Sequence, residues 1–137
     1  MSEKISLIIP CKNEVESLGA VLNEVKDNNF IDEIIVVVDN EEDNSIPVIE
    51  KFNCKLIIQS KKGYGSAIIE GFSKAKNNFG CIYNADYSFD PKYFEDLIKL
   101  SKNNHFIFGS RYKGLGGSDD DDAITFIGNK IFTFIAN

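Results

Sequence analysis

The chain has 137 residues, of which 43% are hydrophobic and 26% are charged, and its formal net charge at pH 7 is −6. This length is sufficient for one domain with a buried core. The acidic balance excludes nucleic acid as the main partner, because binding to a phosphate backbone needs a basic surface, but it permits a phosphorylated small molecule whose charge a metal ion neutralises.

The first part of the chain alternates apolar runs with an amphipathic pattern. Residues 4–9 are rich in β-forming side chains and end at Pro10, which predicts a first strand. Apolar residues then recur at helical spacing and predict an amphipathic helix over residues 14–27. The run over residues 32–39 is almost entirely apolar, as a strand buried on both faces requires.

The same alternation continues through the rest of the chain, with Gly63 and Gly65 marking a turn before the third helix. In chain order, the expected elements are a short helix over residues 45–52, a strand over 54–59, a helix over 67–75, a strand over 79–84, a helix over 91–101 and a fifth strand over 105–110.

Repeated strand–helix units with short connections predict an α/β fold, a doubly wound and mostly parallel sheet with helices on both faces. We expect residues 1–137 to form a single domain. A last helical pattern begins near residue 123 and reaches Asn137 without a Gly or Pro stop signal. We therefore expect a chain truncated before a further segment; a helix that frays at a natural terminus is the alternative.

The three cysteines, Cys11, Cys54 and Cys81, have no CxxC spacing and predict buried free thiols in a reducing compartment. The single histidine, His105, is a weak candidate for a catalytic base. The start of the chain lacks a signal-peptide pattern, so we expect a cytoplasmic protein. The apolar stripe of the last helical pattern fits either a core helix or contact with the inner face of a membrane.

Polar clusters follow the predicted strands, at the edge of a doubly wound sheet where ligands bind. Each cluster also has a structural explanation, for example Asn13 as a helix cap, Asp39 as part of a turn, and Asp43 or Ser45 as a second cap. Their convergence on one edge favours a ligand site. In chain order the clusters are "PCKNE", "DNEEDNS", "KKGYGSA", "NADYSFD" and "GSRYKGLGG".

The stretch "NADYSFD", residues 84–90, is the best candidate for a metal site. Asp86 offers a carboxylate, and Mg²⁺ or Mn²⁺ commonly takes one or two carboxylates together with substrate phosphates and water. Asn84 offers an amide that can ligate a cation through its oxygen or donate to a phosphate through its NH₂ group. Asp90 is expected to cap the next helix, and the acidic run 118–122 to form a solvated loop.

Two further clusters offer groups that suit an anion. The glycine turn opens a helix whose first N–H groups point outward, with Lys61 and Lys62 beside it. Arg111 is the one arginine of a lysine-rich chain. A single arginine after a strand favours bidentate contact to a phosphate or carboxylate, and a surface salt bridge is the alternative.

Taken together, these segments resemble family 2 glycosyltransferases with the GT-A nucleotide-sugar-binding fold, particularly the branch near the dolichyl-phosphate mannosyltransferases. "SLIIPCKNEVESL" resembles the opening strand and the P-x-x-N-E motif of that family, and "DEIIVVVDNEEDNS" resembles its second strand and aspartate turn. "KKGYGSAIIEGFSKAKNNFGCIYNADYSFDP" resembles the glycine turn, its helix and the DxD strand, and "FGSRYKGLGG" resembles the GSR[YF] segment.

The resemblance implies an enzyme that takes a sugar from a UDP- or GDP-sugar with Mg²⁺ or Mn²⁺ and passes it to a polyprenyl phosphate, a glycan or a small molecule. It implies that Asp86 binds the metal, that Asp39 recognises the base or ribose, and that Arg111 meets a phosphate. The implied nucleotide-sugar-binding residues are Pro10, Asn13, Glu14, Asp39, Lys62, Gly63, Gly65, Asn84 and Arg111.

Three positions depart from the family pattern. Asn84 replaces the first aspartate of the DxD motif, Tyr64 stands where the loop often has lysine, and the turn after Asp39 lacks Gly-Ser-Thr. The acceptor-binding part and a general base are expected beyond Asn137, so the catalytic residues stay unknown. Two other functions stay open: a degenerate relative that binds nucleotide weakly, and a sugar nucleotidyltransferase, which the acidic, glycine-free first loop disfavours.

Overall fold

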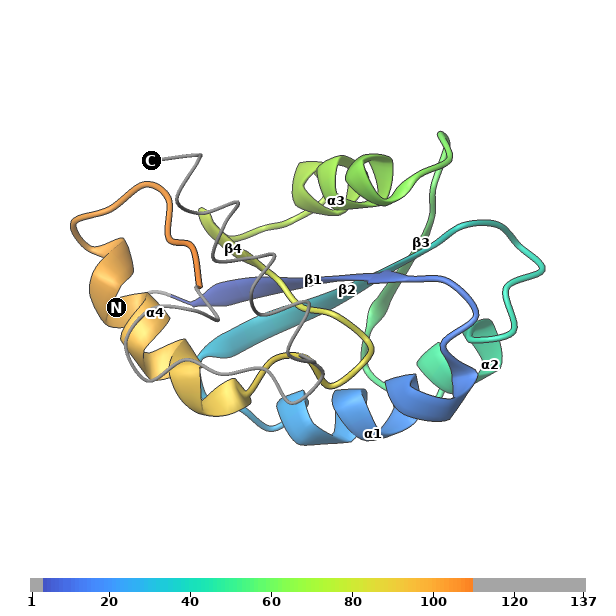
Figure 1. Ribbon diagram of the computed structural model, residues 1–137, viewed down its shortest axis with the longest axis horizontal. Coiled ribbons are helices and arrows are strands. Elements are labelled where there is room, and N and C mark those ends of the chain that lie inside the picture. Colours follow the sequence, from blue (N-terminus) through green and yellow to red (C-terminus); the bar gives the residue numbers. More distant parts are fainter. Residues whose placement is uncertain (1–3, 110–137) are drawn as a thin grey trace, which may run out of the picture. The chain divides into compact units, whose positions relative to one another are not determined.

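The computed structural model describes residues 4–109 (Figure 1). The chain divides into two compact units, Met1–His105 and Phe106–Asn137, and every helix and strand below belongs to the first. Within the described part of the chain, no helix is long and apolar enough to cross a membrane. Arg111, the acidic run 118–122 and the last predicted helix lie outside the described residues.

Four strands of the described residues form one parallel sheet in the order β3-β2-β1-β4. This arrangement confirms the expected α/β fold, because each parallel neighbour is reached by a helical crossover. The strands are β1 (Ile5–Cys11), β2 (Ile31–Val38), β3 (Lys55–Ile58) and β4 (Phe79–Ile82). The helices are α1 (Val15–Val25), α2 (Ile46–Ile49), α3 (Tyr64–Ser73), the 3₁₀ turn η1 (Pro91–Tyr93) and α4 (Phe94–Ser101).

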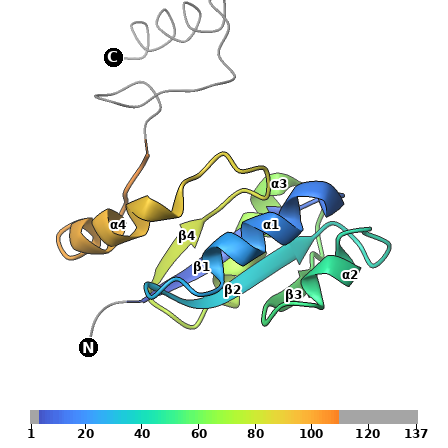
Figure 2. The same cartoon turned by 90° about the horizontal axis from the view of Figure 1, so that it is seen from below.

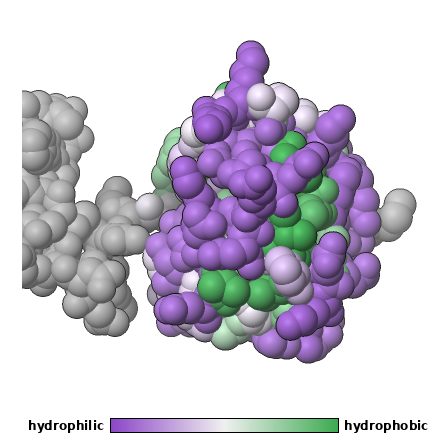
Figure 3. Space-filling view, turned by 90° about the vertical axis from the view of Figure 1, so that its right-hand side faces the viewer, coloured by the Kyte–Doolittle hydropathy of each residue, from purple (hydrophilic) through white to green (hydrophobic). Residues whose placement is uncertain are grey.

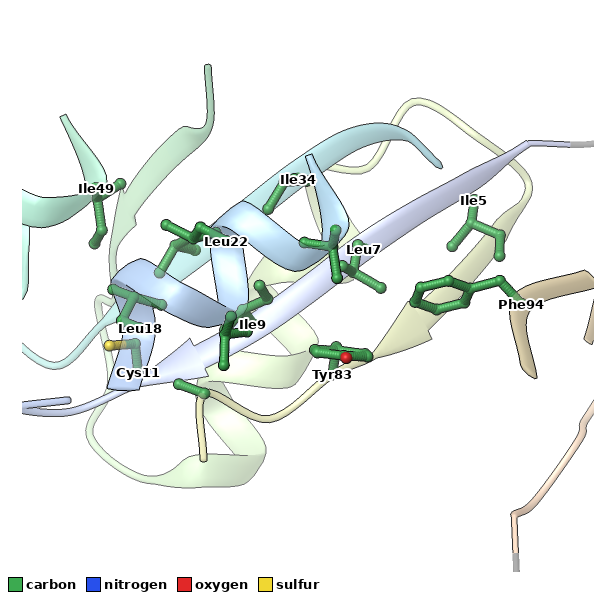
Figure 4. Packing of buried hydrophobic residues seen from close by; sticks show 14 of the residues in the cluster. Ile5, Leu7, Ile9, Cys11, Leu18, Leu22, Ile34, Ile49, Tyr83 and Phe94 are labelled. Atoms are coloured by element: carbon green, nitrogen blue, oxygen red, sulfur yellow. The ribbon is translucent and has the colours of Figure 1, made fainter. Parts of the chain in front are cut away.

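Helices cover both faces of the sheet, with α3 on one side and α1 on the other, as Figures 1 and 2 show from two directions. Successive side chains of β1 point to opposite faces of the sheet, because the side chains of a strand alternate. Leu7 and Ile9 join the larger core with α1, α2 and α4, whereas Ile8 joins the smaller core with α3. Figure 4 shows the larger core, in which side chains from β1 meet Leu18 and Leu22 of α1.

Pro10 lies inside β1 and does not end it, so the predicted strand boundary is wrong. β1 continues to Cys11 and stays paired with β2, but it pairs with β4 only as far as Ile8, whose carbonyl accepts a hydrogen bond from the Tyr83 N–H. Backbone groups of alternate strand residues face the same neighbour, so Pro10 faces the side on which β4 has already ended. Its missing N–H therefore removes no ladder hydrogen bond.

The predicted fifth strand is also wrong in its described part, because residues 105–109 form no strand. A β-forming run becomes a strand only when a neighbouring backbone completes its hydrogen bonds.

Close packing of α3 on the sheet depends on Gly71. A Cβ atom at this position would lie 2.4 Å from Ile8 Cγ2 and 3.2 Å from Val37 Cγ2. The absence of a side chain thus lets the helix backbone approach β1 and β2 directly.

We expect Gly71→Ala to lower the free energy of unfolding by about 1–3 kcal/mol, because the added methyl group overpacks a buried contact. Gly65→Ala is the matched control in the same helix, since a Cβ there meets nothing within 4 Å. That variant should be neutral or up to about 1 kcal/mol more stable. Urea unfolding followed by circular dichroism measures both, and equal effects would contradict the packing argument.

Candidate functional site

The loops that follow β1, β2 and β3 leave the sheet at one edge, on the right-hand side of Figure 1. Parallel strands place all their carboxyl ends together, and ligands of doubly wound sheets bind there. Figure 3 looks onto this side and shows an apolar strip crossing a largely hydrophilic surface. Four of the polar clusters that the sequence singled out lie in these loops and in the loop after β4, and the fifth, which contains Arg111, falls outside the described residues apart from its first glycine.

The first loop joins β1 to α1 and contains the predicted site residues Asn13 and Glu14, and a third, Pro10, lies near the end of β1. Pro10 is half-buried in β1, and Asn13 has a φ of 56°, in the left-handed region that asparagine tolerates. Glu14 occupies the N-cap position of α1, but no side chain caps the helix there. The alternative interpretation of Asn13 as the cap is therefore wrong, because Asn13 precedes the N-cap residue and its backbone is in the left-handed conformation.

Two buried side chains of the β2–α2 loop hold the first loop in place. The Asp43 carboxylate, 5% exposed, accepts hydrogen bonds from the Asn13 N–H at 3.1 Å and from the Ser45 N–H at 2.9 Å. The Ser45 hydroxyl, which is fully buried, accepts one from the Glu14 N–H at 2.8 Å. Backbone donors that would otherwise be orphaned at the start of α1 are thus satisfied from another loop.

Sequence reasoning weighed Asp43 and Ser45 only as a helix cap and missed this role. Ser45 is the N-cap residue of α2 but makes no capping bond with its side chain. The sequence showed only a pair of short polar residues in the loop after the second strand. Local patterns cannot assign such residues to partners in "PCKNE", about 30 residues away.

Asp39, at the end of β2, joins side chains from the ends of the two neighbouring strands. Its Oδ2 lies 3.3 Å from Lys12 Nζ after β1, and its Oδ1 accepts a hydrogen bond from Gln59 Nε2 after β3 at 2.9 Å. The Asp39 side chain is 12% exposed and that of Lys12 is 70% exposed. A carboxylate has about four acceptor positions, so Asp39 can accept further donors from a ligand.

The glycine turn begins at Gly63, whose φ of 115° favours glycine. Gly65 lies inside the first turn of α3, so the prediction that it marks the turn before the helix is wrong. The Glu70 carboxylate of α3 accepts hydrogen bonds from the N–H groups of Ser60 and Lys61, which precede the turn. These hydrogen bonds lower the pKa of Glu70. Lys62 is exposed beside the N-terminus of α3.

The loop after β4 carries Asn84 and Asp86. Asp86 Oδ1 accepts a hydrogen bond from the Ser88 N–H at 3.0 Å, which closes a tight turn with Tyr87 at a φ of 62°. Asp90 accepts from the Lys92 N–H at 2.9 Å and caps η1, as predicted. Within residues 4–109, no three His, Cys, Asp or Glu side chains gather into a metal cage.

Tyr83 anchors this loop to the core. Its hydroxyl donates to the Phe89 carbonyl at 3.0 Å, and its ring lies 5.6 Å from the rings of Phe89 and Phe94. Burial is the main cause that raises the pKa of Tyr83, so the phenol stays protonated. The buried phenol therefore ties both ends of the loop to one place.

The cysteines are free thiols, as predicted, but only Cys11 is buried, and the predicted burial is wrong for the half-buried Cys54 and Cys81. Burial raises the pKa of Cys54 and of Cys81 to about 11 and also raises the pKa of Cys11. A raised thiol pKa lowers the fraction of nucleophilic thiolate, so burial disfavours these cysteines as nucleophiles.

Asp43→Ala should lower the free energy of unfolding by about 1–3 kcal/mol, because the N–H groups of Asn13 and Ser45 lose their acceptor in a buried place. Glu41→Ala, in the same loop, is the control, since the Glu41 side chain is exposed and should stay within about 0.5 kcal/mol of the parent. Thermal and urea unfolding compare the two, and similar values would disprove the tethering role.

Solved structures with a similar fold include glucosyl-3-phosphoglycerate synthase from Mycobacterium tuberculosis. Its complex with Mn²⁺, UDP and phosphoglyceric acid matches with a TM-score of 0.62 at 15% identity, over 74% of this chain and 39% of that one. Its complex with Mg²⁺ and UDP matches with a TM-score of 0.62 at 15% identity, over 74% of this chain and 40% of that one. These matches show a shared GT-A fold.

Curated relatives include "Uncharacterized glycosyltransferase Rv0539" of Mycobacterium tuberculosis H37Rv and "Uncharacterized glycosyltransferase Mb0553" of Mycobacterium bovis. Each is 28% identical over 110 residues, which are 80% of this chain and 49% of the relative. This chain therefore matches about half the length of these relatives. The family model described as "Glycosyl transferase family 2" matches residues 6–136, and the chain belongs to this family.

Proposed function

We propose that the described unit binds the donor of a glycosyltransferase, a UDP- or GDP-sugar, with Mg²⁺ or Mn²⁺. The observation that carries the proposal is the line of polar groups along one edge of a GT-A sheet. Asp39 follows β2, the loop with Asn13 and Glu14 follows β1, and Asp86 follows β4, and these three strands are neighbours in the sheet. An extended ligand such as a nucleotide-sugar fits such a line.

For the nucleoside end, we propose that Asp39 accepts hydrogen bonds from ribose hydroxyls or from the base. Lys12 and Gln59 each engage one of the two carboxylate oxygens and leave further lone pairs available. The loop over Pro10, Asn13 and Glu14 forms the adjoining wall, because the buried carboxylate of Asp43 fixes its backbone.

For the diphosphate, we propose that Asp86 supplies the one protein carboxylate to the metal. Such a site fits Mg²⁺ or Mn²⁺, which commonly bind through one or two carboxylates, substrate phosphates and water. When bound, the cation neutralises the charge that develops on the leaving nucleoside diphosphate. The N-terminus of α3 with Gly63 and Lys62 offers further positive potential, and Arg111 is proposed to meet a phosphate.

For the acceptor, we propose a phosphorylated molecule. The sequence resembles the dolichyl-phosphate mannosyltransferase branch, which supports a polyprenyl phosphate at the inner face of a membrane. The solved relative was crystallised with phosphoglyceric acid, which supports a small phosphorylated acid. Both share an anionic phosphate, and a transfer assay with each class distinguishes them.

Asp86→Ala should weaken Mn²⁺-dependent binding of UDP and GDP by about tenfold or more, equivalent to about 1.4 kcal/mol, because the protein loses its carboxylate ligand. Isothermal titration with each nucleotide, in Mn²⁺ and then in EDTA, measures the effect. EDTA should reduce the affinity of the parent protein to that of the variant.

The matched control is Asp96→Ala, an exposed aspartate of α4 whose carboxylate pairs with Lys99. This variant should bind nucleotide like the parent. If Asp86→Ala retains full Mn²⁺-dependent affinity, the metal assignment is wrong. If the parent binds neither nucleotide, the chain behaves as a degenerate relative.

A further inference from the structure

Asn84 links the metal-site loop to the start of α3. Its Oδ1 accepts a hydrogen bond from the Tyr64 hydroxyl at 3.0 Å, across 20 residues of sequence. Its Nδ2 donates to the Ser88 hydroxyl at 3.1 Å. The side-chain oxygen and nitrogen of Asn84 are thus both engaged within the protein.

The same contacts lead on to Asp86. Ser88, which receives the hydrogen bond from Asn84, donates its own backbone N–H to Asp86 Oδ1 at 3.0 Å. Tyr64, Asn84, Ser88 and Asp86 therefore form one chain of hydrogen bonds. It starts on the first residue of α3 and ends on the candidate metal ligand.

We propose that Tyr64 and Asn84 form a neutral clasp that fixes the orientation of the Asp86 carboxylate. In this assignment Asn84 is a positioning residue and not a metal ligand, and Tyr64 positions Asn84. The link to metal binding rests on the proposed function, whereas the clasp itself does not.

The chemistry of the pair supports this role. An asparagine both accepts and donates, so it can receive the Tyr64 hydroxyl on one side and support the Ser88 hydroxyl on the other. A carboxylate at position 84 could only accept, and it would place a second negative charge two residues from Asp86. The neutral clasp orders the loop without this repulsion, so the cation binds together with the diphosphate that completes its ligands.

Hydrogen exchange at the Ser88 backbone amide tests the clasp in the protein without any ligand. Tyr64→Phe removes one hydroxyl, and we expect hydrogen exchange at the Ser88 amide to become about fivefold faster, as the loss of one net hydrogen bond predicts. The Lys92 amide, which bonds to Asp90 in the next turn, is the internal control and should not change. Tyr93→Phe removes the hydroxyl of an exposed tyrosine outside the clasp and is the matched control variant. Unchanged exchange at Ser88 would overturn the clasp.

Mn²⁺-dependent binding of UDP and GDP then tests the positioning role. Tyr64→Phe and Asn84→Ala should each raise the dissociation constant about fivefold, and the double variant should be no worse than the weaker-binding single variant, because both residues act through one contact. Additive losses would overturn the proposal. So would faster exchange with unchanged affinity, since the clasp would then be structural only. A parent protein that binds neither nucleotide contradicts the proposed function and the positioning role together, while Ser88 exchange still decides whether the clasp exists.

Discussion

The parallel pairing of β1 between β2 and β4 is the constraint on which the rest of the structure depends. Because β1 is central, its residues must be apolar on both faces, and Leu7 and Ile8 accordingly belong to two different cores. Parallel pairing also places the carboxyl ends of all four strands at one edge. The polar loops that follow the strands are brought together by this geometry, whatever their distance in sequence.

Those loops are held by hydrogen bonds that cross from one loop to another. Asp43 and Ser45 fix the backbone at the start of α1, and Tyr64 holds the side chain of Asn84 after β4. The contacts of Asp43 and Ser45 satisfy backbone donors at the start of α1, whereas Tyr64 and Asn84 bond through their side chains, and all of them restrict the loops. A site on these loops is thereby preorganised, which reduces the ordering cost of binding.

The charge of the chain explains why a cation is expected in this site. The protein carries a net charge of −6, and the candidate ligand set around Asp86 contributes one carboxylate where the family pattern has two. A diphosphate beside Asp86 would bring further negative charge, which a cation would offset. Because Asn84 stands in place of the first aspartate of the DxD motif, it adds no negative charge beside Asp86, and in the proposed site more of the metal coordination would come from the substrate.

The sequence by itself determined the order of the elements and which loops are polar, because strand and helix periods and helix caps such as Asp90 are local properties. It did not determine where β1 ends, since Pro10 is tolerated only because β4 has stopped beside it. Nor did it assign Asp43 to the first loop or Tyr64 to Asn84, because these contacts join residues 20 or 30 positions apart. Only the tertiary structure decided them, through the parallel pairing that brings the loops to one edge.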